Sequence, residues 1–241
     1  AKRGSTFDLP IALGILLASG QLTSGREIRA FGELALDGSV KPVPGAYLLA
    51  RTLNEGSAEP CLVPYENRRE TDYFGDARSL PCRSLQEACH LITGGQVVEQ
   101  ELEPPAQTLV TTSIPDLSVL KGQSLAIEAL TVAAAGGHHM MMFGSAGCGK
   151  TTLAAGLPGI LPKLRVDEQR EVAAIYSVAG QLMDAELDFA VAPFRSPHFS
   201  TTPQALFGGG QYPRPGEVSL AHRGVLFLDE LTAFTTQSLT R

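Results

Sequence analysis

The stretch Gly144-Ser-Ala-Gly-Cys-Gly-Lys150-Thr151 follows the pattern GxxxxGK[ST] and decides the fold. Glycines in such a loop let successive backbone N–H groups point at a phosphate, and the N-terminus of the next helix adds its positive dipole. The apolar run His139–Phe143 before the loop predicts a buried strand, and Lys150–Leu157 after it predicts a helix. This order of elements predicts a phosphate-binding loop.

The loop residues have distinct expected roles toward a nucleoside triphosphate. The Lys150 ammonium is expected at the β- and γ-phosphates, as a catalytic group, and the Thr151 hydroxyl is expected to ligate Mg²⁺. The backbone does most of the binding, so the Cys148 side chain needs only to be tolerated. The predicted ATP contacts are Gly144, Ser145, Ala146, Gly147, Cys148, Gly149, Lys150, Thr151 and Thr152.

A second motif, Val225-Leu-Phe-Leu-Asp229-Glu230, places two acids after an apolar run. A buried strand over Val225–Leu228 would carry both carboxylates to the sheet edge that also holds the phosphate loop. Asp229 is then expected in the Mg²⁺ shell, and Glu230 is expected to polarise the attacking water as a general base. An apolar strand ending in two acids is commonplace by itself, and its pairing with the loop makes the prediction specific.

The two motifs are those of a P-loop nucleoside triphosphatase, and Asp229-Glu230 is the AAA+ form of the second. The remaining sequence resembles the magnesium-chelatase-like YifB/ComM family over nearly all of 117–241. One departure is Ser145-Ala146, where the family usually has two prolines. The motifs that carry the resemblance are Val119-Leu-Lys-Gly-Gln123, Gly136-Gly137-His138, Pro158-Gly-Ile-Leu-Pro162, Val172-Ala-Ala-Ile175, Ser177-Val-Ala-Gly180, Pro193-Phe-Arg-Ser-Pro-His198, Gly208-Gly-Gly210 and Pro213-Arg-Pro-Gly-Glu-Val-Ser-Leu-Ala-His222.

The first part of the chain is similar to the Lon-protease-like domain of the same family, with its start missing. The matching motifs are Gly4-Ser-Thr-Phe-Asp-Leu-Pro-Ile-Ala-Leu13, Gly32-Glu-Leu34, Asp37-Gly38 and Val63-Pro-Tyr-Glu-Asn67. Ser5 lies in a different local pattern from the Lon serine, and no lysine stands in 45–50, so proteolysis is not expected.

Local patterns predict the elements of this first part. Helices are expected over Leu9–Ala18, with Asp8 as its N-cap, over Ala46–Leu53 and over Leu85–Ile92. Strands are expected over Ile28–Leu36 and Cys61–Val63.

We therefore predict an α/β fold in two domains. A partial α+β Lon-protease-like domain (ribosomal S5 domain 2-like) over 1–95 is followed by a proline-bearing linker over 96–116. Residues 117–241 are expected to form the N-terminal part of a P-loop AAA+ three-layer α/β/α core. This part ends just after the second motif described above, which is called Walker B. Helices are expected there over Ser124–Ala135 and over Asp167–Ala179, with Asp167 as N-cap.

The resemblance also implies features of the assembly. The family's central strand, sensors and arginine finger would follow Arg241, so a fragment of this kind is expected to bind ATP weakly and hydrolyse it poorly. A homo-hexamer that moves DNA through its pore is implied, with an inserted loop for which Phe194–Thr202 is the candidate segment. Arg195 and His198 are candidate DNA contacts there, and the alternative is that both satisfy local hydrogen bonds.

Composition excludes several classes. A net charge of −6 gives no sign of general nucleic-acid or membrane binding, and the longest apolar runs are too short to span a bilayer. The four cysteines form no CxxC pair, so a zinc site is not expected. The chain shows no secretory features, so free thiols and a cytoplasmic protein are expected.

The leading prediction is an ATPase that uses Mg²⁺ and acts as a hexameric DNA helicase or branch-migration factor in recombination and transformation. One alternative is a magnesium-chelatase-type motor subunit that acts on a protein partner. The other is an ATP-binding regulatory protein without motor output.

Overall fold

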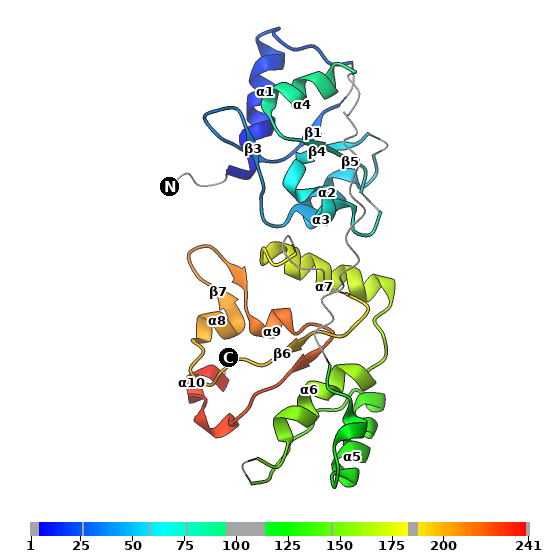
Figure 1. Ribbon diagram of the computed structural model, residues 1–241. Helices are drawn as coiled ribbons and strands as arrows, with labels where there is room; N and C mark the ends of the chain where they lie inside the picture. The colour runs from blue at the N-terminus through cyan, green and yellow to red at the C-terminus, as the bar shows by residue number, and fades with distance from the viewer. Residues whose placement is uncertain are drawn as a thin grey trace. The chain divides into compact units, whose positions relative to one another are not determined.

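The computed structural model describes residues 5–25, 27–57, 59–75, 77–94, 114–145, 147–182 and 188–239 (Figure 1). The chain divides into two compact units, of which unit 1 comprises Ala1–Thr108 and Tyr176–Ala185, and unit 2 comprises Leu109–Ile175 and Glu186–Arg241. Most of the predicted linker 96–116 lies outside the described residues, so the predicted domain boundaries stay predictions.

Helix α1 (Asp8–Ala18) opens unit 1 at the predicted place, but its N-cap differs. A short 3₁₀ turn over Ser5–Phe7 runs directly into the helix, so Phe7 occupies the cap position and no side chain caps it. Asp8 lies inside the first turn instead, where its negative charge still favours the helix dipole. The prediction of Asp8 as N-cap is therefore wrong.

A three-stranded parallel sheet in the order β1-β4-β5 lies within unit 1. Its strands are β1 (Arg29–Ala30), β4 (Cys61–Pro64) and β5 (Ser79–Cys82), and a separate antiparallel pair is made of β2 (Glu33–Leu34) and β3 (Val40–Lys41).

The strand predicted over Ile28–Leu36 is broken at Gly32, which separates β1 from β2. Gly32 has φ 153°, and its carbonyl accepts from Leu9 N at 3.0 Å while its N–H donates to Thr6 O at 2.8 Å. The backbone there is bonded to the start of α1, so it cannot continue a strand.

The other predicted helices of unit 1 are confirmed within a residue or two. They are α2 (Ala46–Asn54) and α4 (Leu85–Ile92), and the short α3 (Arg68–Asp72) is added to them. Two reciprocal contacts start α4: Ser84 Oγ accepts from Glu87 N at 3.1 Å, and Glu87 Oε2 accepts from Arg83 N at 2.7 Å. This arrangement satisfies helix N–H groups that have no partner in the helix itself.

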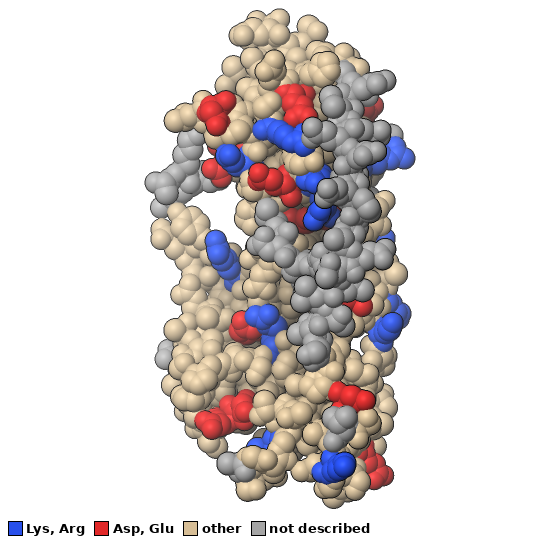
Figure 2. Space-filling view, viewed as in Figure 1, with Lys and Arg blue, Asp and Glu red and all other residues tan. Residues whose placement is uncertain are grey.

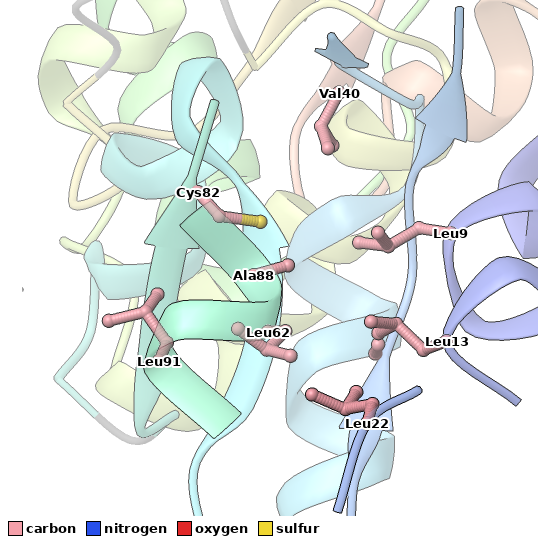
Figure 3. Packing of buried hydrophobic residues seen from close by; sticks show 9 residues of the cluster. Leu9, Leu13, Leu22, Val40, Leu62, Cys82, Ala88 and Leu91 are labelled. Carbon is pink, nitrogen blue, oxygen red and sulfur yellow. The ribbon is translucent and has the colours of Figure 1, made fainter. Parts of the chain in front are cut away.

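The core of unit 1 forms where α1 and α4 meet the sheet (Figure 3). Leu9 and Leu13, four residues apart on α1, are 0% and 1% exposed, and they pack with Leu62 of β4 and Leu91 of α4. Full burial of a leucine side chain stabilises a fold by roughly 1.5–3 kcal/mol. The cysteines are free thiols, as expected, and burial raises the pKa of Cys61 and of Cys82 to about 12.

A buried carboxylate organises the polar part of unit 1. Glu70, 3% exposed, accepts from Tyr47 N at 3.2 Å, from Asn67 Nδ2 at 3.0 Å and from the hydroxyl of Ser177, which is 1% exposed. Burial raises the pKa of Glu70, and the hydrogen bond from Ser177 opposes that rise. The hydrogen bonds from Tyr47 N and Asn67 Nδ2 act in the same direction as that from Ser177, and burial remains the larger effect.

Unit 2 contains both functional motifs. Its long helices are α5 (Ser124–Gly136), α6 (Lys150–Ile160) and α7 (Val166–Val178), the last residues of α7 being counted in unit 1. These helices lie where they were predicted, except that α7 begins before Asp167, which lies in its first turn and is not its N-cap. The shorter elements are β6 (Phe194–Arg195), α8 (Pro203–Phe207), β7 (Gly208–Gly209), β8 (Arg214–Pro215), α9 (Glu217–Leu220), β9 (Val225–Leu226) and α10 (Thr236–Leu239).

The segment His139–Phe143 does not form the predicted buried strand. Residues 139–143 carry no strand, and Met141 and Phe143 are 62% and 87% exposed. Among the described residues no strand pairs with this segment, and a single strand without a ladder is not stable.

Unit 2 contains a parallel pair of strands, but it joins β9 to β6, for which no strand was predicted, and not to the segment 139–143. Val225 and Leu226 pair with Phe194 and Arg195, and the β9 residues are half-buried rather than buried.

The prediction of an inserted loop over Phe194–Thr202 is wrong at its start, because Phe194 and Arg195 form a strand of the sheet.

A glycine-rich antiparallel hairpin, β7–β8, lies later in the chain, between α8 and α9.

Candidate nucleotide-binding site

The phosphate-binding loop connects residues 139–143 to the start of α6. Gly147 and Gly149 have φ 77° and 89°, in the left-handed region that glycine enters without strain. Gly149 occupies the N-cap of α6, and its carbonyl accepts from Leu153 N at 2.9 Å. Ala146, one of the predicted ATP contacts, lies outside the described residues. The backbone therefore turns sharply into a helix N-terminus, which is the geometry that binds anions.

The Lys150 side chain folds back over this loop. Its Nζ donates to Gly144 O at 3.0 Å and to Ser145 O at 2.9 Å, and lies 3.7 Å from Cys148 Sγ. Two backbone carbonyls at the start of the loop thus hold the ammonium. A phosphate oxygen carries a negative charge that these neutral carbonyls lack, so it would be the stronger partner of the ammonium.

The next two residues of α6 are exposed, and one of them touches the second motif. Thr151 Oγ1 donates to Asp229 Oδ2 at 3.0 Å, and Thr152 lies beside it in the first turn of α6. Asp229 follows β9, whose pairing with β6 extends through a hydrogen bond of 2.8 Å from Phe227 N to Arg195 O. The structure therefore brings together the hydroxyl and the carboxylate that were predicted to share a metal.

These two side chains fit Mg²⁺ by their chemistry. Mg²⁺ takes oxygen ligands and is usually held through one or two carboxylates, waters and substrate phosphates. Thr151 and Asp229 supply a hydroxyl and a carboxylate oxygen within 3.0 Å of each other, at the start of the helix that follows the phosphate loop. No group of three or more His, Cys, Asp or Glu side chains able to hold a metal is found in the described residues. Water molecules and the phosphates of a nucleotide would be the further ligands of a Mg²⁺ held here.

Glu230 follows Asp229 with an unusual backbone. Its φ is 52°, in the left-handed region that glutamate rarely adopts. Two hydrogen bonds hold this conformation: Glu230 N donates to Asp229 Oδ1 at 3.0 Å, and Glu230 O accepts from Ala233 N at 2.7 Å. The residue is exposed. Backbone strain of this kind is common at functional sites.

The two candidate DNA contacts differ in their surroundings. Arg195 makes a two-point ion pair with Glu217 of α9, with Nε at 2.6 Å from Oε2 and Nη2 at 2.8 Å from Oε1. His198 is exposed, its ring lies 4.1 Å from that of Phe199, and its Nδ1 lies 2.7 Å from Ser200 Oγ. For Arg195 the geometry favours the alternative interpretation, a contact that supports the fold. His198 stays a candidate contact.

Two residues of this region make contacts that the sequence did not predict. Gln123, named above only as part of a family motif, donates from Nε2 to Cys148 O at 2.8 Å. Glu217, also part of a quoted motif, holds Arg195. No local pattern marks either contact, since the partners stand 25 and 22 positions apart in the chain.

Charges of both signs lie on the face that Figure 2 presents, where basic and acidic side chains are interspersed. Arg223 binds Glu171 of α7 at 2.9 Å, and His222 Nε2 lies 2.9 Å from the same carboxylate. The hydrogen bonds from Arg223 and His222 lower the pKa of Glu171 to about 2. None of the helices in the described part of the chain has the length and apolar character needed to cross a membrane.

Comparison with known proteins relates both parts of the chain to one group of proteins. Residues 116–241 match the family model "Magnesium chelatase, subunit ChlI", and residues 1–67 match the model "Subunit ChlI of Mg-chelatase". YifB of Escherichia coli K12, named as uncharacterised, is 39% identical over 240 residues, which cover 99% of this chain and 47% of that protein. The competence protein ComM of Haemophilus influenzae is 37% identical over 246 residues, with the same shares of 99% and 47%. The chain spans about half the length of the curated relatives it matches.

Proposed function

Since this chain belongs to the magnesium chelatase subunit ChlI family, a family of AAA+ proteins, and is homologous to YifB and ComM, we propose that it binds ATP with Mg²⁺ and contributes to ATP hydrolysis. The observation that carries the proposal is the joint placement of Lys150 on the phosphate loop and of Thr151 against Asp229. A glycine-rich turn that bound nothing would have no need of this second contact.

In the proposed reaction the backbone N–H groups of 144–150 bind the phosphates of ATP, and the Lys150 ammonium leaves its carbonyl partners for phosphate oxygens. Thr151 and Asp229 hold the Mg²⁺, which neutralises phosphate charge. A water molecule attacks the γ-phosphorus as the bond to the β–γ bridging oxygen breaks. Glu230 accepts the proton of that water as general base. Lys150 and Glu230 are thus the proposed catalytic residues.

Substitution of Lys150 in the full-length protein tests this proposal. Lys150→Ala should lower ATP affinity sharply and abolish turnover, whereas Lys163→Ala, a change of the same kind after α6, should leave both unchanged. Calorimetric titration with ATP and Mg²⁺ and a phosphate-release assay measure the two quantities. Equal affinity and turnover in native protein and Lys150→Ala would refute the proposal.

For the whole protein we propose a hexameric DNA motor with helicase or branch-migration activity in recombination and transformation. Support comes from the similarity to a competence protein and from the exposed ring pair of His198 and Phe199, which suits contact with a nucleic-acid backbone or base. Neighbouring subunits would complete each ATP site with an arginine, so residues 1–241 alone should hydrolyse ATP poorly.

Two other functions predict different results in one experiment on the full-length protein. Branched or single-stranded DNA should stimulate phosphate release by a DNA motor. Stimulation by a chelatase partner protein instead would favour a chelatase-type motor subunit, the function that the family name suggests. ATP binding without hydrolysis would favour a regulatory protein.

A further inference from the structure

The side chain of Gln123 contacts the backbone of the phosphate loop. Its Nε2 donates to Cys148 O at 2.8 Å, and both residues are half-buried. The backbone of Gln123 starts a helix at the same time, because its carbonyl accepts from Ile127 N at 2.9 Å at the N-terminus of α5. One residue thus connects the first turn of α5 to the loop that precedes α6.

The carbonyl that Gln123 holds belongs to the same peptide unit as Gly149 N–H. All described peptide bonds are trans. The Cys148 carbonyl and the Gly149 N–H therefore lie in one peptide plane and point in opposite directions within it. A donor that fixes the carbonyl on one side of the loop therefore fixes the N–H toward the other side. Gly149, with φ 89°, would otherwise let this peptide unit rotate with little steric resistance.

The segment that precedes Gln123 packs against both helices. Leu117, 7% exposed, lies a few residues earlier and packs with Leu130 of α5 and Leu153 of α6. Gly156 of α6 permits this close packing, because a Cβ there would lie 2.3 Å from Leu117 Cδ2. The backbone before Gln123 is thus fixed to both helices, and the amide reaches the loop from a rigid position.

We propose that Gln123 is a positioning residue of the nucleotide site: it orients the Cys148–Gly149 peptide so that Gly149 N–H faces the phosphates of the nucleotide. The inference rests on the proposed ATP binding and adds a residue that the phosphate-loop motif itself does not contain. Gln123 acts through the loop and touches no reacting atom.

The test compares three variants of the full-length protein in ATP turnover and in binding of ATP with Mg²⁺. Gln123→Met keeps the length of the side chain and removes the donor, and Gln123→Lys keeps a donor of similar reach. Gln86→Met, an exposed change on α4, is the matched control. A lost hydrogen bond to the loop should raise KM and Kd for ATP roughly three- to tenfold in Gln123→Met. Because the loop binds the phosphates in both ground and transition states, kcat should stay unchanged.

Each outcome decides between interpretations. A raised KM at constant kcat in Gln123→Met, restored by Gln123→Lys and absent from Gln86→Met, supports the proposal. A lowered kcat at constant KM would mean a smaller folded fraction and would overturn it, as would native affinity in Gln123→Met. If Gln123→Met does not fold, Gln123→Leu, which is uncharged and lacks a donor, replaces it with the same expectations. Should native protein and Lys150→Ala bind ATP equally, the proposed function fails first and the inference fails with it.

Discussion

Thr151 Oγ1 donates a hydrogen bond of 3.0 Å to Asp229 Oδ2, across a separation of 78 positions in the chain. This contact joins the first turn of α6 to the segment after β9, and so places the two sequence motifs at one point. In the proposed site, the loop would bind the phosphates, and the Asp229 carboxylate would supply the negative charge that a cation beside them requires.

Removing the Thr151 hydroxyl should separate the metal-dependent part of ATP binding from the rest. Thr151→Val keeps the side-chain shape but cannot ligate Mg²⁺, so affinity for ATP measured with Mg²⁺ should fall about tenfold or more, while affinity measured with EDTA changes little. Thr151→Ser retains the hydroxyl and is the control. Calorimetry on the full-length protein under both conditions measures the difference. A fall of equal size with and without Mg²⁺ would contradict the role assigned to this hydroxyl.

Glu230→Gln should preserve binding and abolish hydrolysis. The amide cannot accept a proton from water, and loss of a general base slows such reactions by roughly 10²- to 10⁴-fold. The Glu230 backbone is held by its own N–H and carbonyl, so the substitution should leave the Thr151–Asp229 contact in place. Phosphate release and ATP affinity of the full-length variant are the measurements. Turnover at the native rate would exclude Glu230 as the base.

Several features of this fold were predictable from local sequence. The helices around the phosphate loop were predicted because their apolar spacing and glycine boundaries are local signals, and α5 and α6 lie where the pattern indicates. The prediction of a strand over His139–Phe143 was wrong because a strand needs a neighbouring strand for its hydrogen bonds, and none of the described strands pairs with this segment. The contacts of Gln123 with Cys148 and of Arg195 with Glu217 depend on tertiary packing, which residue spacing does not encode.

Substitution of Arg195 should affect stability rather than nucleic-acid binding. The side chains of Arg195 and Glu217 are 27% and 24% exposed and share two hydrogen bonds. Arg195→Met leaves the Glu217 carboxylate without this partner, which should lower the free energy of unfolding by about 1–3 kcal/mol. Arg195→Met combined with Glu217→Leu should recover part of that loss, because no unpaired charge remains. Urea denaturation followed by circular dichroism measures both.

Measurements of stability and of DNA binding together separate the two candidate DNA contacts. His198→Ala changes an exposed side chain and should leave the free energy of unfolding unchanged. If the full-length protein contacts DNA at this loop, His198→Ala should weaken DNA binding without loss of stability. Weakened DNA binding by Arg195→Met at native stability would show instead that the guanidinium is available to DNA.

The buried carboxylate of Glu70 should make the stability of unit 1 depend on pH. Burial raises its pKa, so the folded chain holds the Glu70 proton more tightly than the unfolded chain does. This contribution to stability is complete below the ordinary glutamate pKa of about 4.3 and is lost as pH rises from there through the raised value.

The hydroxyl of Ser177 opposes the shift by donating to the carboxylate. Ser177→Ala should therefore raise the pKa of Glu70 further and extend the loss of stability to higher pH. Urea titrations between pH 4 and pH 8, followed by circular dichroism, compare the two chains. Glu70→Gln serves as control and should show a flatter pH dependence at lower overall stability, because its amide N–H group faces donors at Tyr47 and Asn67. Identical pH profiles for native protein and Glu70→Gln would show that Glu70 does not titrate with folding.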